Sequence, residues 1–469
     1  MSYSVTPNLK NDQSIHVEFS RHTDEHGQLV LILENESMGE SDLFNCLKNL
    51  EVHPTPKSIE IKKDSSLIYI YGSSNAVHQI SYDIVKDYND PPLNRYRYRP
   101  IVDSTYFHVL GTKLFMYPSD LFSTQDAKVR IDITWNFADK QNEFHSSFGN
   151  HKQQHLNISQ DELHNSFFVG GDFRRYEFNH QNKPVHFLTR GQWKPIKDKE
   201  VLNILERTIR NQYTFWNDSI DKLYSVSLIP TYETNSYSVG GSALTDSFIS
   251  YASNNIGTTI QGLTWLYNHE LMHKWIGRTI QIEEDVVQYW FSEGFTDYYA
   301  YKLMLKNNDL DLQGFINVIN NEIIVPHYGD TVATIPNSEL TFETYWSNYA
   351  TYAKLPYRRG LLYAFLIDTQ IKQQSEFSKS LDDLMFELIT TAKEDADFRI
   401  NERVFQNYLI KYLDEKSAIN EFESYIVNGE LINFKGKLLN GLILEYENDI
   451  PKIKIDAKIS NELLKQLQL

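Results

Sequence analysis

Histidine, glutamate and histidine are spaced for metal chemistry in the segment LYNHELMHKWIG, which contains His269, Glu270 and His273. Residues four apart on an α-helix lie only about 40° apart around its axis, so both imidazoles can bind one ion. Glu270 is rotated by about 100° from His269, so its carboxylate can flank the ion without being a ligand. A carboxylate in that position can hold and deprotonate a metal-activated water, which predicts a general base for hydrolysis.

A third ligand is available in the segment WFSEGFTDYY, where Glu293 follows His273 after residues 274 to 292. Two antiparallel helices joined by a loop can bring this carboxylate to the two imidazoles. Two histidines and one carboxylate leave a fourth position open, as in catalytic zinc sites, and magnesium would not prefer these donors. The sequence therefore predicts one zinc ion per chain, held by His269, His273 and Glu293.

Asp297 lies four residues beyond Glu293, on the same face of the predicted helix. Its carboxylate can accept a hydrogen bond from the far nitrogen of a ligand histidine, which fixes the tautomer and raises the basicity of that ligand. Four aromatic residues also flank the motifs: Trp265, Trp275, Trp290 and Phe291. Because such side chains more often pack helices together than stack on a substrate, we assign them to the core.

These side chains need helices and a sheet to position them. Hydrophobic periodicity predicts a helix over 258–276, which Gly277 can close, and a second helix over 290–306. The segment 197–220 is also periodic as a helix, and KLYSVSLIP after it is typical of a strand. Residues 236–251 are expected to form a glycine-containing pair of strands.

The rest of the chain predicts a multidomain α+β protein. Short alternating segments such as SIEIKK, LIYIYG, VRIDITWNF and FFVGGDFRRYEF recur up to about residue 187 and favour a β-sandwich-like domain. Helical patterns dominate from about residue 310, and strand-like LINFKG and LILEYEND follow near the end. We expect an N-terminal β domain over 1–187, a catalytic domain with the metal motif over 188–380 and a mainly helical domain over 381–469.

Composition excludes several other classes of protein. A net charge of -17 repels phosphate backbones, so neither nucleic acid nor an anionic membrane is an expected partner. The N-terminus has no signal-like pattern, and no run of about 18 apolar residues occurs. The single cysteine, Cys46, excludes intrachain disulfides and thiolate zinc clusters. We therefore expect a cytoplasmic protein, and the sequence does not determine its oligomeric state.

Two other groups of residues could do chemistry but have simpler explanations. Arg358 and Arg359 could bind a substrate carboxylate, although an exposed basic pair is the more common state. A polar stretch contains four irregularly spaced histidines: His145, His151, His155 and His164. We expect a solvated loop there rather than a metal cluster.

The set HELMH followed by EGFTDYY resembles the gluzincin peptidases, whose catalytic domain is thermolysin-like. The segments YDIVKDY, VLGTKLFMYP, YRRGLLYAFLID and FESYIVNGELINFKGKLL together resemble the glycyl-aminopeptidase family of gluzincins. The resemblance covers most of the chain, with the zinc motif as its most specific part. It implies an N-terminal β domain, a thermolysin-like domain and a helical C-terminal part, and the PDZ domain that often follows is not expected in this chain.

The resemblance also implies a residue that stabilises the oxyanion. In related gluzincin aminopeptidases a tyrosine ahead of a basic residue and a glycine has this role, and TYAKLPYRRG offers Tyr357 at that position. A phenol O–H aimed at the developing oxyanion would act beside the metal as a second electrophile. Tyr352, five residues earlier, matches another tyrosine of that group.

The chain departs from the family in the glycine-containing strand. Aminopeptidases of this clan carry a glutamate just after the glycines, which binds the substrate amino group, whereas here Gly240 and Gly241 are followed by SALTD. The two glycines can still let a peptide backbone pair as an extra strand. Asp246 could replace the missing glutamate, although a shift along a strand can reverse the face on which a side chain lies.

These observations predict a zinc-dependent peptidase, with peptides as its substrates. We expect an aminopeptidase that acts on short peptides, with Glu270 activating water and Tyr357 stabilising the oxyanion. The missing glutamate leaves an endopeptidase or a non-peptide zinc hydrolase as alternatives. A non-catalytic peptide-binding module is the alternative from another class.

Overall fold

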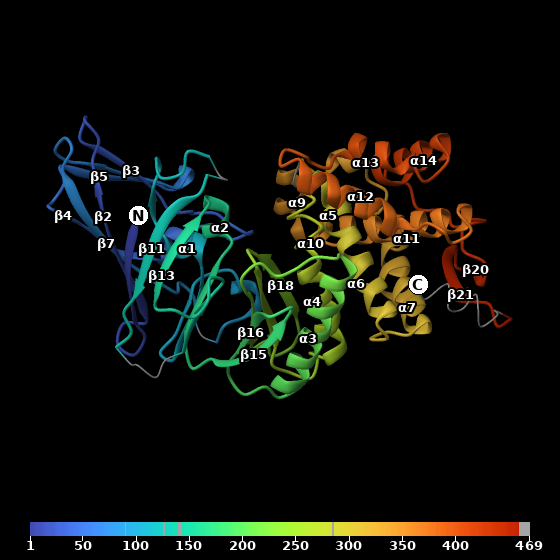
Figure 1. Cartoon of the computed structure of the whole chain (residues 1–469), viewed down its shortest axis with the longest axis horizontal. Helices are drawn as coiled ribbons and strands as arrows, with labels where there is room; N and C mark the ends of the chain where they lie inside the picture. The colour runs from blue at the N-terminus through green and yellow to red at the C-terminus, as the bar shows by residue number, and fades with distance from the viewer. Residues whose placement is uncertain (90, 125–126, 139–142, 284–285, 459–469) are drawn as a thin grey trace. The chain divides into compact units, whose positions relative to one another are not determined.

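The computed structural model describes residues 1–89, 91–124, 127–138, 143–283 and 286–458. It contains two compact units, of which the first comprises Met1–Glu206 and Ser219–Leu263, and the second comprises Arg207–Asp218 and Thr264–Leu469 (Figure 1). An N-terminal β-rich part and a helical C-terminal part confirm the predicted α+β class. The division into three domains stays a prediction, and its boundary at residue 187 falls within strand β16 (Lys183–Thr189).

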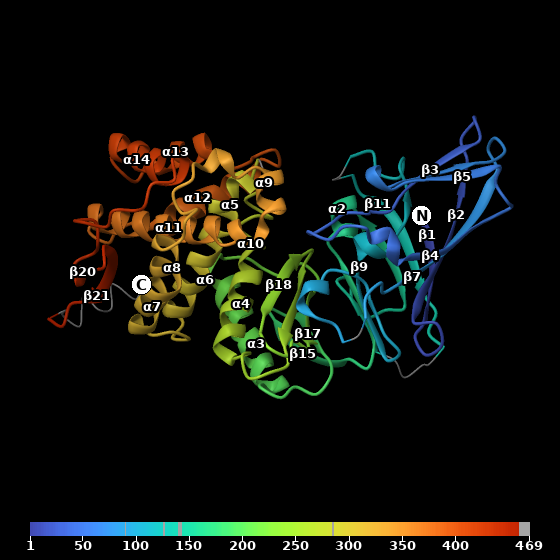
Figure 2. The ribbon, with the colours of Figure 1, turned by 180° about the vertical axis from the view of Figure 1, so that it is seen from behind.

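Alternating side chains build the N-terminal sheets of the first unit. In β2 (Ser14–His22), Ile15, Val17 and Phe19 are buried while the residues between them are less so. This strand lies in a six-stranded sheet of order β13-β11-β1-β2-β7-β4. Its other strands are β1 (Ser2–Asn8), β4 (Leu47–His53), β7 (Val77–Val85), β11 (Val129–Trp135) and β13 (Gln153–Ile158) (Figure 2).

Two four-stranded sheets complete this β-rich part. One has the order β10-β3-β6-β5 and comprises β3 (Gln28–Ile32), β5 (Ser58–Lys62), β6 (Leu67–Tyr71) and β10 (Tyr117–Pro118). The other has the order β12-β14-β9-β8 and comprises β8 (Ile101–Val102), β9 (Tyr106–Leu110), β12 (Glu143–Ser146) and β14 (Phe167–Gly171). The predicted strands in SIEIKK, LIYIYG, VRIDITWNF and FFVGGDFRRYEF are confirmed.

A five-stranded sheet of order β15-β16-β17-β19-β18 belongs to the same unit. Its further strands are β15 (Arg174–His180), β17 (Tyr224–Thr231), β18 (Val239–Leu244) and β19 (Ser247–Ser253). Strands β16, β17 and β19 run parallel, and all eight residues of β17 are buried, as expected for a strand covered on both faces. Strand β18 pairs antiparallel with β19 at the edge, which confirms the predicted strand pair.

The prediction of a solvated loop around the four histidines is wrong for three of them. His145 lies in β12, His155 in β13 and His164 in the short helix α2 (Gln160–His164). His145 is fully buried, with its Nε2 atom 2.9 Å from the Ser225 hydroxyl. Burial of a polar side chain depends on a partner distant in sequence, so the local pattern could not reveal it. Within the described residues these histidines form no group that could hold a metal.

Helices dominate the second unit (Figure 1). They are the ends of α3 (Asp198–Phe215) and α4 (Ile260–Met272), then α5 (Tyr289–Ser292), α6 (Gly294–Lys306), α7 (Leu312–Val318), α8 (Val325–Tyr328), α9 (Phe342–Ser347), α10 (Tyr349–Tyr352), α11 (Leu355–Gln374), α12 (Leu381–Glu394), α13 (Glu402–Leu409) and α14 (Glu415–Phe422). A hairpin of β20 (Leu442–Glu447) and β21 (Ile450–Ile455) follows. Within the described ranges, no helix is both long and apolar enough to span a membrane.

The strand predicted in LINFKG is wrong. Ile432 and Phe434 are buried at alternate positions, which produced the strand-like pattern. However, no described strand pairs with this segment, and the Ile432 carbonyl accepts a hydrogen bond from the Tyr328 hydroxyl instead. The alternation of apolar residues therefore reflects the burial of an extended segment, and it does not show that the segment belongs to a sheet. The neighbouring prediction in LILEYEND is confirmed as β20.

Candidate metal centre

The two histidines of the HELMH motif lie at the end of α4. His269 is within the helix, and His273 follows its last residue, Met272, in a tightened turn. There the amides of Lys274 and Trp275 donate to carbonyls three residues earlier, both at 3.0 Å. Helices often end in such a turn, so the helical spacing of the two imidazoles is kept although α4 ends earlier than predicted.

The C-terminal end of α3 packs beside α4 and fixes its position within the second unit. The Gln212 side chain donates to the Asn268 carbonyl at 2.7 Å, next to His269. The Trp216 indole lies with its Nε1 atom 3.3 Å from the Met272 sulfur, next to His273. Because these contacts are buried, they hold the two ligand histidines on a rigid support.

Glu293 lies at the junction of α5 and α6. Its φ of -102° departs from regular helix, so the helix predicted over 290–306 is two helices. Hydrogen bonds of 2.9 Å from the Glu293 amide to the Tyr289 carbonyl, and from the Asp297 amide to the Glu293 carbonyl, continue the helical pattern across the junction. Glu293 and Asp297 therefore still share one helix face.

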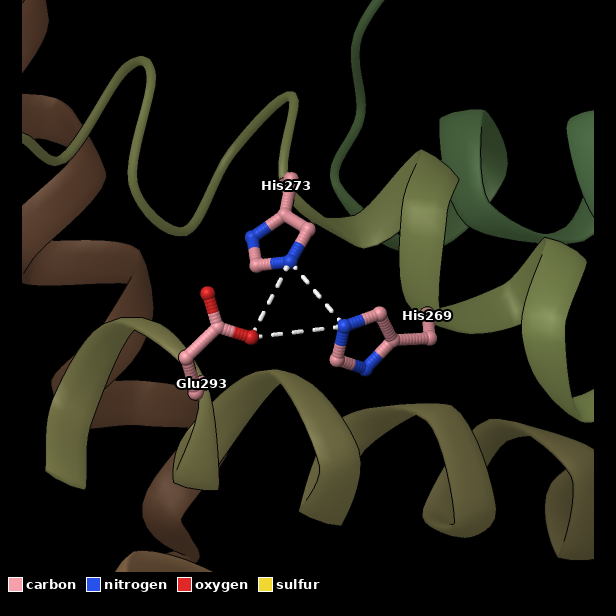
Figure 3. Close-up of side chains that lie close together, drawn as sticks. All are labelled: His269, His273 and Glu293. Atoms are coloured by element: carbon pink, nitrogen blue, oxygen red, sulfur yellow. Dashed lines mark hydrogen bonds and ion pairs between the residues drawn. The ribbon is translucent and has the colours of Figure 1, made fainter. Parts of the chain in front are cut away.

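The three predicted ligand atoms converge on one point (Figure 3). The two histidine Nε2 atoms are 3.1 Å apart, and Glu293 Oε2 lies 3.4 Å from that of His269 and 3.5 Å from that of His273. Zinc bonds of about 2.0–2.2 Å at tetrahedral angles place ligand atoms about 3.3–3.6 Å apart. Glu293 Oε2 is buried and has no hydrogen-bond partner among the described residues, as a metal-binding oxygen requires. The donor set and its spacing fit zinc.

Hydrogen bonds on the far side of each imidazole set its tautomer. His269 donates from Nδ1 to Asp297 Oδ1 at 2.8 Å, and His273 donates from Nδ1 to the Ile276 carbonyl at 3.2 Å. Nε2 is therefore the nitrogen of each imidazole that can supply a lone pair to an ion at the centre. The predicted contact between Asp297 and a ligand histidine is present in the structure.

The centre has the electrostatics of a cation site. Burial alone would lower the pKa of His269, but the charge and hydrogen bond of Asp297, with Glu293 and Glu270, raise it to about 10. Burial would likewise raise the pKa of Glu293, yet the imidazoles of His273 and His269 hold it well below its usual range. Negative charge is thus concentrated around the point where the ligand atoms meet, which favours a divalent cation.

Glu270 lies in α4 next to His269 and is only 5% exposed. Its charge is among the causes that raise the pKa of His269, so the carboxylate acts electrostatically on the centre. The three converging atoms belong to His269, His273 and Glu293, and Glu270 is not among them. The role of Glu270 as a general base that flanks the ion stays a prediction.

Tyr357 lies beside the centre on the first turn of α11. Its ring stacks on the His269 imidazole with the centroids 6.1 Å apart and an angle of 16° between the planes. Burial and the negative charge of Glu293 raise the pKa of Tyr357 well above its usual value, so its phenol keeps its proton. A neutral phenol can donate a hydrogen bond to an oxyanion.

Two glycines allow α11 to approach the helix pair that carries Glu293. A Cβ atom on Gly360 would lie 1.9 Å from the Trp290 carbonyl oxygen, and one on Gly294 would lie 2.4 Å from the Gly360 Cα. Only glycine permits such a backbone approach. The close contact fixes Tyr357 and Glu293 relative to each other.

Residues 197–420 match the sequence model of the peptidase family M1 domain. The chain carries a peptidase family M1 domain. This match confirms the gluzincin resemblance and identifies residues 197–420 as a zinc peptidase domain. No curated protein sequence matches the chain significantly.

Solved structures of M1 proteins share the fold. The aminopeptidase N family protein from Idiomarina loihiensis superposes with a TM-score of 0.77 at 15% identity, over 95% of this chain and 79% of that chain. An M1 zinc metallopeptidase from Deinococcus radiodurans, as a Glu-to-Ala mutant bound to a Tyr-Ser-Ala substrate, gives a TM-score of 0.55 at 12% identity. That match covers 92% of this chain and 94% of that chain. The likeness confirms the predicted fold class.

Trp265 contributes to the centre of this M1 peptidase in a way that the sequence did not indicate. Its indole N–H donates to Asp297 Oδ1 at 3.2 Å, so the oxygen that orients His269 accepts two hydrogen bonds. The three other flanking aromatic residues are fully buried, as predicted: Trp275, Trp290 and Phe291. The spacing of Trp265, four residues before His269, is the only sequence signal that could have suggested its contact.

Replacing Asp297 with asparagine is expected to weaken zinc binding of this M1 peptidase by about 10–100-fold. The amide would lose the negative charge that favours the Nε2-ligating form of His269. Zinc affinity can be measured by competition with a chromogenic chelator, with Asp397→Asn as the control because Asp397 is an exposed aspartate of the same unit. If the Asp297 variant binds zinc with unchanged affinity, the hydrogen bond from His269 to Asp297 does not contribute to zinc binding.

The two predicted substrate-pairing glycines lie in edge strand β18. No heavy atom other than those of its chain neighbours would lie within 4 Å of a Cβ on Gly240, so this position is open on the side-chain face. The Gly241 carbonyl accepts a hydrogen bond from the Tyr98 hydroxyl at 2.6 Å. An edge strand with an open glycine is suited to pairing with an extended peptide. This role of Gly240 and Gly241 stays a prediction.

Asp246 lies in the turn between β18 and β19, with a φ of 41°. The turn consists of Thr245 and Asp246, since Leu244 already pairs with Ser247. Aspartate tolerates this left-handed conformation, which gives Asp246 a structural explanation besides the predicted one. Six residues of extended chain correspond to about 20 Å, so Asp246 and Gly240 lie at opposite ends of β18.

The remaining predicted residues lie close to Tyr357 in sequence. Tyr352 ends α10, is half-buried, and packs with Tyr345 and Leu355 in a small apolar cluster. The expectation of an exposed basic pair is wrong for Arg359, which is only 2% exposed. Arg358 forms an ion pair of 3.4 Å with Asp330. Arg359 is buried because the face of α11 that carries it packs against residues 333–335.

Proposed function

We propose that this M1 peptidase is an aminopeptidase that removes residues from the N-termini of short peptides. The observation that carries the proposal is the convergence of His269, His273 and Glu293 beside two further groups, the Glu270 carboxylate and the Tyr357 phenol. Zinc bound there would polarise the scissile carbonyl and lower the pKa of its water toward about 7.

In this proposal, the side chains around the centre transfer protons, stabilise the oxyanion and orient a ligand histidine. Glu270 takes the proton of the attacking water and delivers it to the leaving amine. Tyr357 donates its O–H to the oxyanion, for which its raised pKa keeps it protonated. Asp297 and Trp265 hold His269 in the orientation that directs Nε2 at the centre. Separately, the edge strand β18 of the first unit offers Gly240 and Gly241 for pairing with an extended peptide.

Matched tetrapeptides with free and acetylated N-termini test the proposal. The free amine is expected to raise kcat/KM by about 100-fold, since a charged hydrogen bond to the substrate amine is worth about 3 kcal/mol. A chelator should abolish the cleavage and added zinc should restore it. Equal cleavage of both peptides would identify an endopeptidase, and the absence of a glutamate just after Gly240 and Gly241 would then explain it.

The same experiment separates the remaining alternatives. If neither peptide is cut although the protein binds zinc stoichiometrically, peptide hydrolysis is excluded. A non-peptide zinc hydrolase would then act on an ester or epoxide in the same assay. A peptide-binding module would bind the free tetrapeptide without cutting any of these substrates.

A further inference from the structure

Arg359 is a buried guanidinium with incomplete hydrogen bonding. It lies on α11 and is only 2% exposed. Its Nη2 atom donates to the carbonyls of Ile335 at 2.6 Å and Ala333 at 3.2 Å. Its Nε and Nη1 atoms are buried and have no hydrogen-bond partner in the part of the chain that the structure describes. Three of its five N–H groups are therefore unsatisfied.

The charge of Arg359 also lacks a counter-charge. Among the described residues no carboxylate forms an ion pair with it, whereas its neighbour Arg358 is paired with Asp330. Burial alone accounts for the lowering of the Arg359 pKa to about 10. A guanidinium remains charged under these conditions, and a buried charge without a partner costs several kcal/mol. Native structures resolve such a cost with a bound ion or water.

A second unsatisfied group lies on the neighbouring helix. His327 is buried on α8, which packs against α11, and its Nδ1 atom has no described hydrogen-bond partner. Burial and then the charges of Arg359 and Arg358 lower the pKa of His327 to about 3, so its imidazole is neutral. With its proton on Nδ1, this ring is a further donor directed into the interior.

We propose that Arg359 and His327 bind a small monovalent inorganic anion, such as chloride, between α8 and α11. The anion accepts hydrogen bonds from Arg359 Nη1 and His327 Nδ1 and neutralises the buried guanidinium. A Cβ atom on Gly429 would lie 2.8 Å from Arg359 Nη2 and 2.2 Å from the Ile335 carbonyl oxygen, so backbone covers the Nη2 side of the guanidinium and leaves Nη1 for the anion.

Binding at this position would stabilise the start of α11. Arg359 is two residues from Tyr357 and adjacent to Gly360, which contacts Trp290. The proposal concerns stability and does not depend on the proposed hydrolytic function. Its tests therefore need no turnover of a substrate.

Crystals of the full chain grown in sodium bromide provide the direct test. Bromide is close to chloride in size and scatters X-rays anomalously. An anomalous peak within hydrogen-bond distance of Arg359 Nη1 is the expected result. Ordered water there, without an anomalous peak, would overturn the proposal.

Thermal unfolding provides a second test in solution. Sodium chloride replaces sodium gluconate at constant ionic strength, so that an organic carboxylate is exchanged for a small inorganic anion and ionic strength does not change. At about ten times the Kd of chloride, the Tm is expected to rise by about 3–6 °C. Arg359→Gln should abolish this rise, and Arg358→Gln should keep it. An equal rise in the Arg359 variant, or none in the unmodified protein, contradicts the proposal, and if that variant does not fold the bromide experiment decides.

Discussion

Replacing Glu270 with glutamine is expected to lower kcat by about 10²–10⁴-fold while the protein still binds one zinc ion. Glutamine has the size and shape of glutamate but cannot accept a proton at neutral pH. Glu270 is buried next to His269 and is not among the three converging ligand atoms, so its loss should spare the metal. The variant therefore separates proton transfer from zinc binding.

The measurement pairs steady-state kinetics on a free tetrapeptide with the zinc content of the same protein sample. Glu339→Gln is a matched control, because Glu339 is exposed in the same unit and lies outside the centre. It should keep full activity. A Glu270 variant that retains zinc and more than about a tenth of the activity would assign the general base to another group.

The metal centre was predictable because its information is local. His269 and His273 are four residues apart, so one helix turn brings them to the same face. Glu293 and Asp297 are also four residues apart and share a face of the next helix for the same reason. Only the approach of the two helices had to be assumed. The structure supplies that approach through the Asp297 carboxylate on α6, which accepts hydrogen bonds from Trp265 and His269 on α4.

The parts that the sequence did not reveal depend on contacts between distant segments. His145 has its partner at Ser225, in another sheet, and nothing in its own polar stretch indicates burial. Arg359 was expected to be exposed because basic residues usually are, but its donors contact carbonyls of Ala333 and Ile335. Local sequence patterns indicate the periodicity of a helix or strand. The hydrogen-bond partners of a buried polar group depend on tertiary structure, which those patterns do not contain.

The domain boundary at residue 187 stays a prediction, but the sheet that its neighbouring strands join depends on tertiary contacts for the same reason. Strands β15 and β16 continue the alternating pattern of the N-terminal sheets, so the sequence placed the boundary near their end, at residue 187 within β16. In the structure they pair with each other and with β17, and belong to the five-stranded sheet. Which sheet a strand joins depends on its edge partners, and alternation does not encode those partners.

Replacing Tyr357 with phenylalanine is expected to lower kcat by about 10²–10³-fold with little change in KM. The substitution removes only the hydroxyl, so the ring can keep its stacking on His269 and zinc binding should be unaffected. A donor to the oxyanion acts mainly in the transition state, which is why kcat rather than KM should change. Kinetics on the free tetrapeptide, together with zinc content, measure both quantities.

Two other tyrosine variants make this test specific. Tyr446→Phe removes a hydroxyl from an exposed ring in β20 and should leave kcat unchanged. Tyr352→Phe tests the other tyrosine near the centre, which packs in an apolar cluster with Leu355. Because a stacked ring on His269 places Tyr357 closer to the reacting carbonyl, its variant should have the larger effect. A larger loss in the Tyr352 variant would transfer the role of oxyanion donor to that residue.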